Sequence, residues 1–277
     1  MRGRPRANAC KRSAPDDDVT GGETRRTVVL LKLTITPAVI VAASLLGRRF
    51  GPSFAGWLVG FPFTSAPVSI FLTLEQGAAF AASSAVGSIV SASADVAFAL
   101  VFMWMSRAGW PTALLTASLA FAAAALGLGS LIHDPLIAAS VTLGALLMAP
   151  RLGAAAPDHS AAPGSLPGWD LPSRALVATA LVVGITAVAP LVGPIVSGVI
   201  SGIPVYASVL AVFAHRNGGA RSGAAVMRGL LAGLYGFATF FVVIALAIVP
   251  LGALAAFALA LIAVLAVQAA SLASLRR

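Results

Sequence analysis

Charged residues are scarce in this chain of 277 residues. Only 10% of the residues are charged and 59% are apolar, and the mean hydropathy is +0.97. Soluble domains carry about a quarter charged residues, so the charges present here are too few to cover a surface that faces water. The composition therefore excludes an ordinary soluble domain and predicts an integral membrane protein.

Residues for covalent or metal chemistry are also scarce. The single cysteine, Cys10, excludes a disulfide framework and a site built from several thiolates. The three histidines have no acidic companions at metal-ligand spacing, and no G-x-S-x-G, H-E-x-x-H or P-loop pattern occurs. We therefore expect no catalytic residue, no metal and no cofactor, and a protein that is not an enzyme.

The charges that are present are mostly basic. Lys and Arg number 18 against 9 Asp and Glu, which gives a net charge of +9 and a pI near 11.4. Such a pI is typical of nucleic-acid-binding domains, but here the basic residues are single or paired between apolar runs, as at the ends of membrane helices. The expected partner is the lipid bilayer and not a nucleic acid. Many Arg, Ala and Gly residues favour a bacterial source.

Apolar runs long enough to cross a bilayer, about 20 residues each, predict an all-α, polytopic bundle of about nine spans. The run at 135–149 is shorter than the others and is bounded by Pro135 and Pro150. The predicted spans are 28–47, 54–74, 78–105, 111–131, 135–149, 174–191, 194–214, 220–249 and 251–275.

An internal repeat aligns without gaps at an offset of 142 residues. Two prolines in register with three glycines within twelve residues are a strong signal, even in a chain rich in Ala and Gly. The matches are Gly51-Pro52 with Gly193-Pro194, Gly56 with Gly198, Gly60 with Gly202, and Pro62 with Pro204. We infer two repeats of four helices each that are joined by one extra span.

The repeat divides the chain into five parts. Residues 1–27 hold seven basic and four acidic residues and no apolar run, so they are a disordered basic tail or precede a natural start near Val28. The other parts are membrane repeat 1 (28–131), a linking span (132–149), a Pro/Gly-rich loop (150–173) and membrane repeat 2 (174–277).

Loop charges indicate how the repeats face. Half one has basic loops after its first and third helices (Arg48, Arg49, Arg107) and an acidic one after its second (Glu75). In half two the loop after the second helix is basic instead (His215, Arg216, Arg221). Because cytoplasmic loops retain Lys and Arg, this pattern favours inverted halves, nine spans and an outside N-terminus. Eight spans with parallel halves stay open, because that arrangement places Arg25 and Arg26 inside.

Part of the first half resembles a known family. Ala55-Gly56, Phe61-Pro62-Phe63-Thr64 and Glu75-Gln76-Gly77, followed by a helix of small residues, resemble the GlpM-like family of small bacterial four-helix membrane proteins. The stretch from Phe50 to Ser65 is also similar to larger uncharacterised inner-membrane proteins. The resemblance covers about residues 30–130 and implies a duplicated four-helix unit in the cytoplasmic membrane, without a substrate or reaction. Half two departs from it, with Val205-Tyr206 and Asn217 in place of Phe63-Thr64 and Glu75.

Glycines and prolines mark the second helix of each half. Glycines four residues apart lie on one helix face and let helix backbones approach closely; here they are Gly56, Gly60, Gly198 and Gly202. Prolines remove a backbone donor and interrupt the helix; here they are Pro62, Pro67 and Pro204. Interrupted helices in equivalent positions of two repeats point to a transport site. Half two has no counterpart of Pro67, so its helix is either broken or only kinked.

Asp95 is the only carboxylate deep inside an apolar run. Together with Ser84, Ser88 and Ser91 it forms a polar stripe at helical spacing. Intramembrane ionisable residues usually face a partner or a water path, although such a residue can also be a packing residue. In inverted halves Arg228 lies at a similar depth, so we expect an Asp95–Arg228 ion pair, with snorkelling of Arg228 to the interface as the alternative.

These features predict a small secondary transporter or permease for an unknown small substrate or ion, with a site between the two repeats. The alternative is a membrane scaffold or accessory subunit that supports envelope biosynthesis, in which the glycine faces bind another protein. A second copy of the chain is a further expected partner. The predicted pathway residues are Asp95, Arg228, Thr64, Ser65, Tyr206, Ser208, Ser88 and Ser91.

Overall fold

The structure, a computed structural model, is an all-helical bundle. It describes residues 34, 37, 38, 40–63, 65–153, 171–173, 175–177, 179, 180 and 193–275, and this part of the chain contains no strand. Residues 40–50 are helical. The elements with defined bounds are α2 (Pro52–Val59), α3 (Ser65–Gln76), α4 (Ala78–Met105), the 3-10 turn η1 (Ser106–Ala108), α5 (Trp110–Leu131), α6 (Pro135–Leu152), α8 (Pro194–Ser201), α9 (Val205–Leu251) and α10 (Ala253–Leu275).

Within the described residues, five helical stretches are long and apolar enough to span a membrane. They are Ala78–Ala108, Trp110–Leu131, Pro135–Leu152, Pro194–Leu251 and Ala253–Leu272. Large apolar side chains such as Leu126 and Leu254 point outward, which suits contact with lipid. The prediction of an all-helical membrane protein is thereby confirmed, whereas the count of nine spans stays a prediction, because the spans 28–47 and 174–191 are only partly covered by the described residues.

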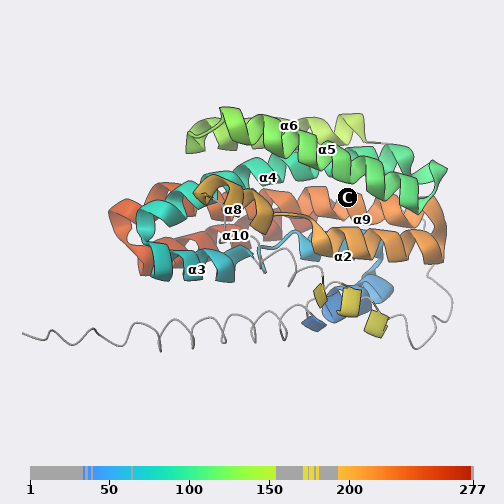
Figure 1. Ribbon diagram of the computed structural model, residues 1–277. Coiled ribbons are helices and arrows are strands. Elements are labelled where there is room, and N and C mark those ends of the chain that lie inside the picture. The colour runs from blue at the N-terminus through green and yellow to red at the C-terminus, as the bar shows by residue number, and fades with distance from the viewer. Residues whose placement is uncertain are drawn as a thin grey trace, which may run out of the picture.

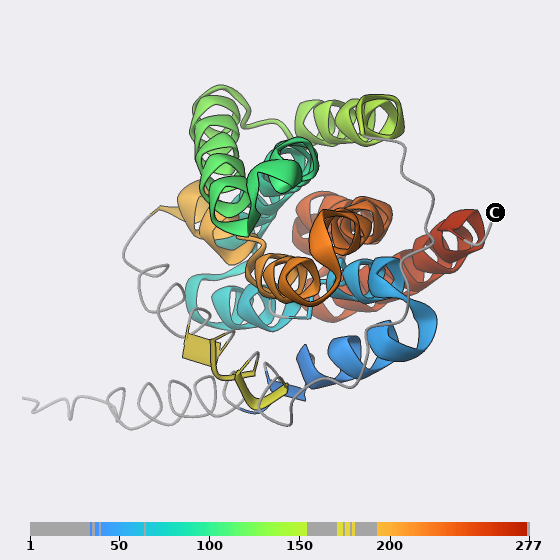
Figure 2. The ribbon, with the colours of Figure 1, turned by 90° about the vertical axis from the view of Figure 1, so that its right-hand side faces the viewer.

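The helices form layers around a central pair. Helices α4 and α9 pack against each other, and α5 and α6 cover one face of the bundle in both views (Figures 1 and 2). The most apolar window of α4 is 89% buried, whereas that of α5 is 17% buried. Helix α4 is therefore the core of the bundle, and α5 is an outer helix.

The first of the two predicted breaks separates α2 from α3. Helix α2 ends at Val59, and the chain leaves the helical ladder before α3 begins at Ser65. The amide of Phe63 donates to the carbonyl of Phe61 at 2.8 Å, which closes a γ-turn of three residues. Proline cannot continue a helix through its missing N–H, so Pro62 fits this non-helical stretch. The predicted span 54–74 is thus two short helices in line.

The second break, between α8 and α9, repeats the geometry of the first. The amide of Val205 donates to the carbonyl of Ile203, again at 2.8 Å, as Phe63 does to Phe61. The backbone amide of Ser208 then donates to the carbonyl of Pro204, as the amide of Ala66 donates to the carbonyl of Pro62, both at 2.9 Å. The helix of half two is therefore broken and not only kinked, although it lacks a counterpart of Pro67. Pro67 itself lies in the first turn of α3, a position that tolerates proline.

Glycines in a left-handed conformation reverse the chain after each interrupted helix. Gly77 precedes α4 with φ 87° and ψ 168°, and Gly219 interrupts α9 with φ 76° and ψ −175°. This region of backbone space is essentially restricted to glycine. Gly219 divides α9 into a first segment (205–218) and a second segment (220–251), and the chain doubles back there in Figure 1.

Helix α2 packs on the second segment of α9 through glycine. A β-carbon at Gly56 would collide with the carbonyl oxygen of Val226, and one at Gly60 with the backbone of Gly233. The residue numbers of the contacting positions increase together along the two helices, from Gly56 and Val226 to Gly60 and Gly233, so the two helices run in the same direction. The glycine face of the first half is thus occupied by the second half.

Helix α8 makes the same contact with α4. A β-carbon at Gly198 would collide with the carbonyl oxygen of Ser84, and one at Gly202 with the side chain of Ser91. Val226 and Gly233 of α9 are the repeat counterparts of Ser84 and Ser91. Each half therefore lays its interrupted helix on the third helix of the other half, and the contacts are reciprocal. Gly56, Gly60, Gly198 and Gly202 thus all lie at close contacts between helices.

Two polar clusters attach the outer helices. On α6, the hydroxyl of Thr142 lies 2.7 Å from that of Ser93 and donates to the carbonyl of Ile89. On α10, the amide of Gln268 donates to the carbonyl of Gly233, and Trp57 of α2 reaches Ser271 at 2.9 Å. The tail 1–27 and most of the 150–173 loop lie outside the described residues.

Candidate functional site

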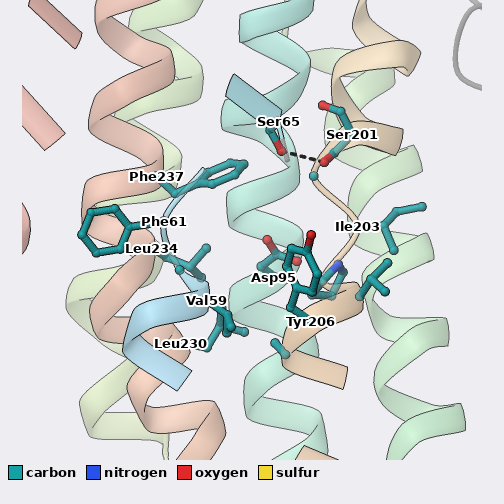
Figure 3. A pocket seen from close by; sticks show the side chains of 15 residues that line it. Val59, Phe61, Ser65, Asp95, Ser201, Ile203, Tyr206, Leu230, Leu234 and Phe237 are labelled. Atoms are coloured by element: carbon teal, nitrogen blue, oxygen red, sulfur yellow. Dashed lines mark hydrogen bonds between the residues drawn. The ribbon is translucent and has the colours of Figure 1, made fainter. Parts of the chain in front are cut away.

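The two helix breaks meet at a small cavity in the middle of the bundle. It has a volume of about 40 Å³ and is lined by residues of α2, α3, α4, α8 and α9. Figure 3 shows Ser65 and Ser201 at one end of the cavity, Leu230 and Val59 at the other, and Asp95 and Tyr206 between them. The remaining lining residues are Gly60, Phe61, Gly202, Ile203, Pro204, Val205, Ala207, Leu234 and Phe237.

Both halves of the sequence repeat contribute to the wall of the cavity, and several of the lining residues are counterparts in the repeat. Gly60 and Gly202 both line it, as do Phe61 and Ile203. The chemistry of the two sides differs, however. The counterpart of Asp95 is Phe237, and both line the cavity. Counterparts from the sequence repeat therefore line the cavity together, but only one member of this last pair is ionisable.

Asp95 is the one residue with a carboxyl group among the described residues that line this cavity. Its side chain is 3% exposed, and its Oδ1 atom has no hydrogen-bond partner among the described residues. An Asp in the middle of a membrane helix costs about 3 kcal/mol on insertion scales. Most buried polar atoms in proteins have a hydrogen-bond partner, so a lone carboxylate oxygen directed at a cavity is an exception that points to a ligand.

Serines line the contact between α4, α3 and α8. Ser65 at the start of α3 donates a 2.7 Å hydrogen bond to the carbonyl of Ser201, the last residue of α8. On α4, the hydroxyl of Ser88 lies 3.3 Å from the carbonyl of Gly198. Ser91 donates to the carbonyl of Ser88 in its own helix and lies against Gly202. The predicted stripe on α4 is thus buried against α8, and Asp95 is its one member that lines the cavity.

Arg228 is the residue that the sequence predicts as the partner of Asp95. It is not among the residues that line the cavity, whereas Leu230, two residues later on the same helix, is one of them. The expected Asp95–Arg228 ion pair stays a prediction, because a similar depth in the membrane does not by itself place two side chains on facing sides of neighbouring helices.

The other predicted pathway residues divide into two groups. Ser65 and Tyr206 line the cavity. Ser208 does not, because its hydroxyl donates to the carbonyl of Pro204 in its own helix at 2.7 Å. Thr64 lies outside the described residues.

Sequence reasoning missed Ser201 and the apolar wall. Ser201 lies directly before the Gly-x-Pro of the second break, and that position is a signal that could have identified it. Its hydroxyl also lies 3.5 Å from that of Ser88. Phe61, Leu234 and Phe237 give no such signal, because they are three apolar residues in a chain that is 59% apolar.

The size of the cavity limits what it can hold in this conformation. A water molecule needs about 10–15 Å³ by this measure, so about 40 Å³ accommodates about three waters or a small ion. An organic substrate of drug-like size does not fit without movement of the lining helices. Within the described residues no three His, Cys, Asp or Glu side chains gather as metal ligands.

Comparisons with known proteins give no relative: no protein-family model, no curated protein and no solved structure matches this chain.

Proposed function

We propose that this protein is a small secondary transporter or permease whose site lies between two inverted repeats. The observation that carries the proposal is the cavity at the meeting point of two interrupted helices, with a buried carboxylate directed at it. Irregular backbone at membrane depth is tolerated where it is buried in protein or lines a cavity. Transporters with inverted repeats place their substrate and ion sites at such helix breaks.

The directions of the helices support inverted halves. Helix α2 runs in the same direction as the second segment of α9, and α8 in the same direction as α4, as the order of their glycine contacts shows. Within each half, the glycine turns at Gly77 and Gly219 make the interrupted helix antiparallel to the helix that follows. The interrupted helices of the two halves therefore run in opposite directions.

The distribution of charge agrees with this arrangement. The turn at Gly219, with Arg216 and Arg221, lies at the end of the bundle where η1 carries Arg107, since His215 contacts the carbonyl of Ser106 at 2.7 Å. Glu75 lies at the other end, before α4. Basic loops mark the cytoplasmic side, so we assign the arginine-bearing end to the cytoplasm and the location to a bacterial inner membrane.

The packing also favours a transporter over a scaffold. A scaffold that binds a partner through its glycine faces needs these faces free. Here the faces of Gly56 and Gly198 are occupied inside the chain by α9 and α4. We retain in the proposal a duplicated unit that resembles GlpM-like proteins and a protein that is not an enzyme.

Cysteine accessibility tests whether the cavity opens to water. A Cys10→Ala variant has no cysteine, and Ser201→Cys in this background places a thiol on the cavity wall. We expect a membrane-impermeant thiol reagent to modify it from at least one side of sealed vesicles, because a transporter must open its site. Ser93→Cys is the matched control, buried against Thr142 and not on the cavity.

Asn217→Cys, at an exposed position near the end of the first segment of α9, is the positive control for labelling. If Ser201→Cys stays as unreactive as Ser93→Cys from both sides, the cavity is sealed and the transporter proposal fails.

A further inference from the structure

The lining of the cavity has a single formal charge. Of the described residues around it, only Asp95 is ionisable at neutral pH, and the others are Ser, Tyr, Gly, Pro or apolar. We propose that this cavity binds one monovalent inorganic cation, a proton or an alkali-metal ion, with Asp95 Oδ1 as its principal ligand. This inference names the ligand of the proposed transport site and rests on that function only for the movement of the ion.

The dipoles of the four helices that end or begin at the cavity cancel, so Asp95 determines the sign of the electrostatic potential there. Helices α2 and α8 end there, at Val59 and Ser201, and bring the negative ends of their dipoles. Helices α3 and α9 begin there, at Ser65 and Val205, and bring positive ends. Each end is equivalent to about half a charge, so the two pairs cancel. The carboxylate makes the net field negative, which selects a cation.

The number of carboxylates sets the charge of the ion. A single carboxylate balances one positive charge in an apolar interior, where an unbalanced charge is expensive. Sites for Ca²⁺ take six to eight oxygen ligands, commonly from several carboxylates, and the repeat counterpart of Asp95 is Phe237. The apolar residue in the second half therefore excludes the second carboxylate that a divalent site would use.

Size and oxygen donors fit the same class of ligand. About 40 Å³ holds a small ion with one or two waters, but not an organic cation of many atoms. The hydroxyls of Ser65 and Ser201 line the cavity, and each has lone pairs to offer. Interrupted helices also expose backbone carbonyls at their ends, which coordinate Na⁺ or H⁺ in other transporters.

A binding experiment that does not require transport tests the proposal. We would measure the Tm of the purified protein in detergent micelles while NaCl, KCl or LiCl replaces choline chloride at constant ionic strength. A ligand that binds only the folded state stabilises it by mass action, so we expect at least one alkali ion to raise the Tm of the wild type. Asp95→Asn keeps the size of the side chain and is expected to lose this rise.

Glu75→Gln is the matched control, because it removes an exposed carboxylate far from the cavity and should respond as the wild type does. If no alkali ion changes the Tm, infrared spectra test for the proton instead. The carbonyl band of a protonated carboxyl group, absent in Asp95→Asn, should then titrate within about two units of pH 7, where a proton-carrying group operates.

Each outcome has a defined meaning. An alkali-ion response or a titrating band that requires Asp95 supports the cation site and tells the two ions apart. A Tm insensitive to salt together with a carboxyl band that does not titrate in this range overturns it, as does a salt response that Asp95→Asn retains. Cation binding without reactivity of Ser201→Cys would count against transport alone, so the two proposals fail separately.

Discussion

At the scale of single residues, two neighbouring polar side chains of α4 have opposite environments. Ser93 is buried and its hydroxyl lies 2.7 Å from that of Thr142 on α6. Asp95, two residues later, is equally buried but has an oxygen without a partner. A satisfied buried group holds the structure together, whereas an unsatisfied one costs free energy. The first belongs to the attachment of α6 and the second to the cavity.

Thr142→Val tests the attachment of α6. Valine keeps the shape of threonine but removes the hydroxyl that contacts Ser93 and the carbonyl of Ile89. Leaving a buried donor or acceptor without a partner costs about 1–3 kcal/mol, so we expect a loss of this size in the free energy of unfolding. The measurement is unfolding of the purified protein in micelles.

Thr116→Val is the matched control, because that hydroxyl is only partly buried and contacts carbonyls of its own helix alone, those of Thr112 at 2.8 Å and Ala113 at 3.3 Å. It should change stability by less than about 0.5 kcal/mol. A double variant, Ser93→Ala with Thr142→Val, should recover part of the loss, because both partners are then apolar. An equal loss for Thr142→Val and Thr116→Val would contradict this account.

Residues of the site could be predicted from the sequence where an ionisable side chain lies within an apolar, membrane-spanning run. Asp95 could be found from sequence because a carboxylate in an apolar run is rare. Arg228 met the same criterion, but its depth said nothing about which helix face it occupies. Phe237 could not be found at all, because its role depends only on being opposite Asp95 across the repeat.

At the scale of elements, proline and glycine in the repeat indicated where the second helices break. Each break is closed by one hydrogen bond, from the amide of Phe63 to the carbonyl of Phe61 or from that of Val205 to that of Ile203. Each turn contains a single proline, Pro62 or Pro204. Pro67 is therefore not required for a break. Which helix each glycine face meets was not predictable, because the pattern G-x3-G defines a face and not its partner.

Gly56→Ala and Gly198→Ala should both destabilise the protein. In each case the new methyl group collides with a backbone carbonyl, of Val226 or of Ser84, which cannot rotate away. Overpacking of this kind costs about 1–3 kcal/mol and sometimes more. We expect similar losses for the two variants, because the contacts are repeat counterparts, and thermal unfolding in micelles measures both.

The control uses glycines in outer helices. At Gly127 on α5 and Gly144 on α6, no atom lies within 4 Å of the position that an added methyl group would occupy. Gly127→Ala and Gly144→Ala should be neutral or stabilising by up to about 1 kcal/mol, because alanine is the better helix former. Equal behaviour of all four variants would show that close helix approach does not hold the two halves together.

At the scale of the whole molecule, equivalent loops of inverted halves must lie on opposite sides of the membrane. Glu75→Cys and Asn217→Cys occupy the same position of the repeat, and both sites are exposed. In a Cys10→Ala background, an impermeant thiol reagent applied to intact cells should label Glu75→Cys and not Asn217→Cys. Permeabilised cells, in which both should react, are the control. Labelling of both from the same side would show parallel halves.

The repeat was visible in the sequence, and the all-helical membrane class followed from the composition together with the length of the apolar runs. The contact between the halves was not visible, since it depends on the packing of four helices that are distant in the chain. Reciprocal contacts such as Gly56 with Val226 and Gly198 with Ser84 arise from the fold. They explain why the cavity forms where it does, at the point where the two exchanged helices are broken.

This exchange of helices also bears on how the protein is made. During synthesis α2 enters the membrane long before its partner, the second segment of α9, exists, whereas α8 meets an α4 that is already in place. Contacts between such distant segments form late in folding. Neither half is complete by itself, so residues 1–153 and 171–277 expressed as separate fragments should assemble only with each other. A gene that arose by duplication would then descend from a single unit that was already an interlocked dimer.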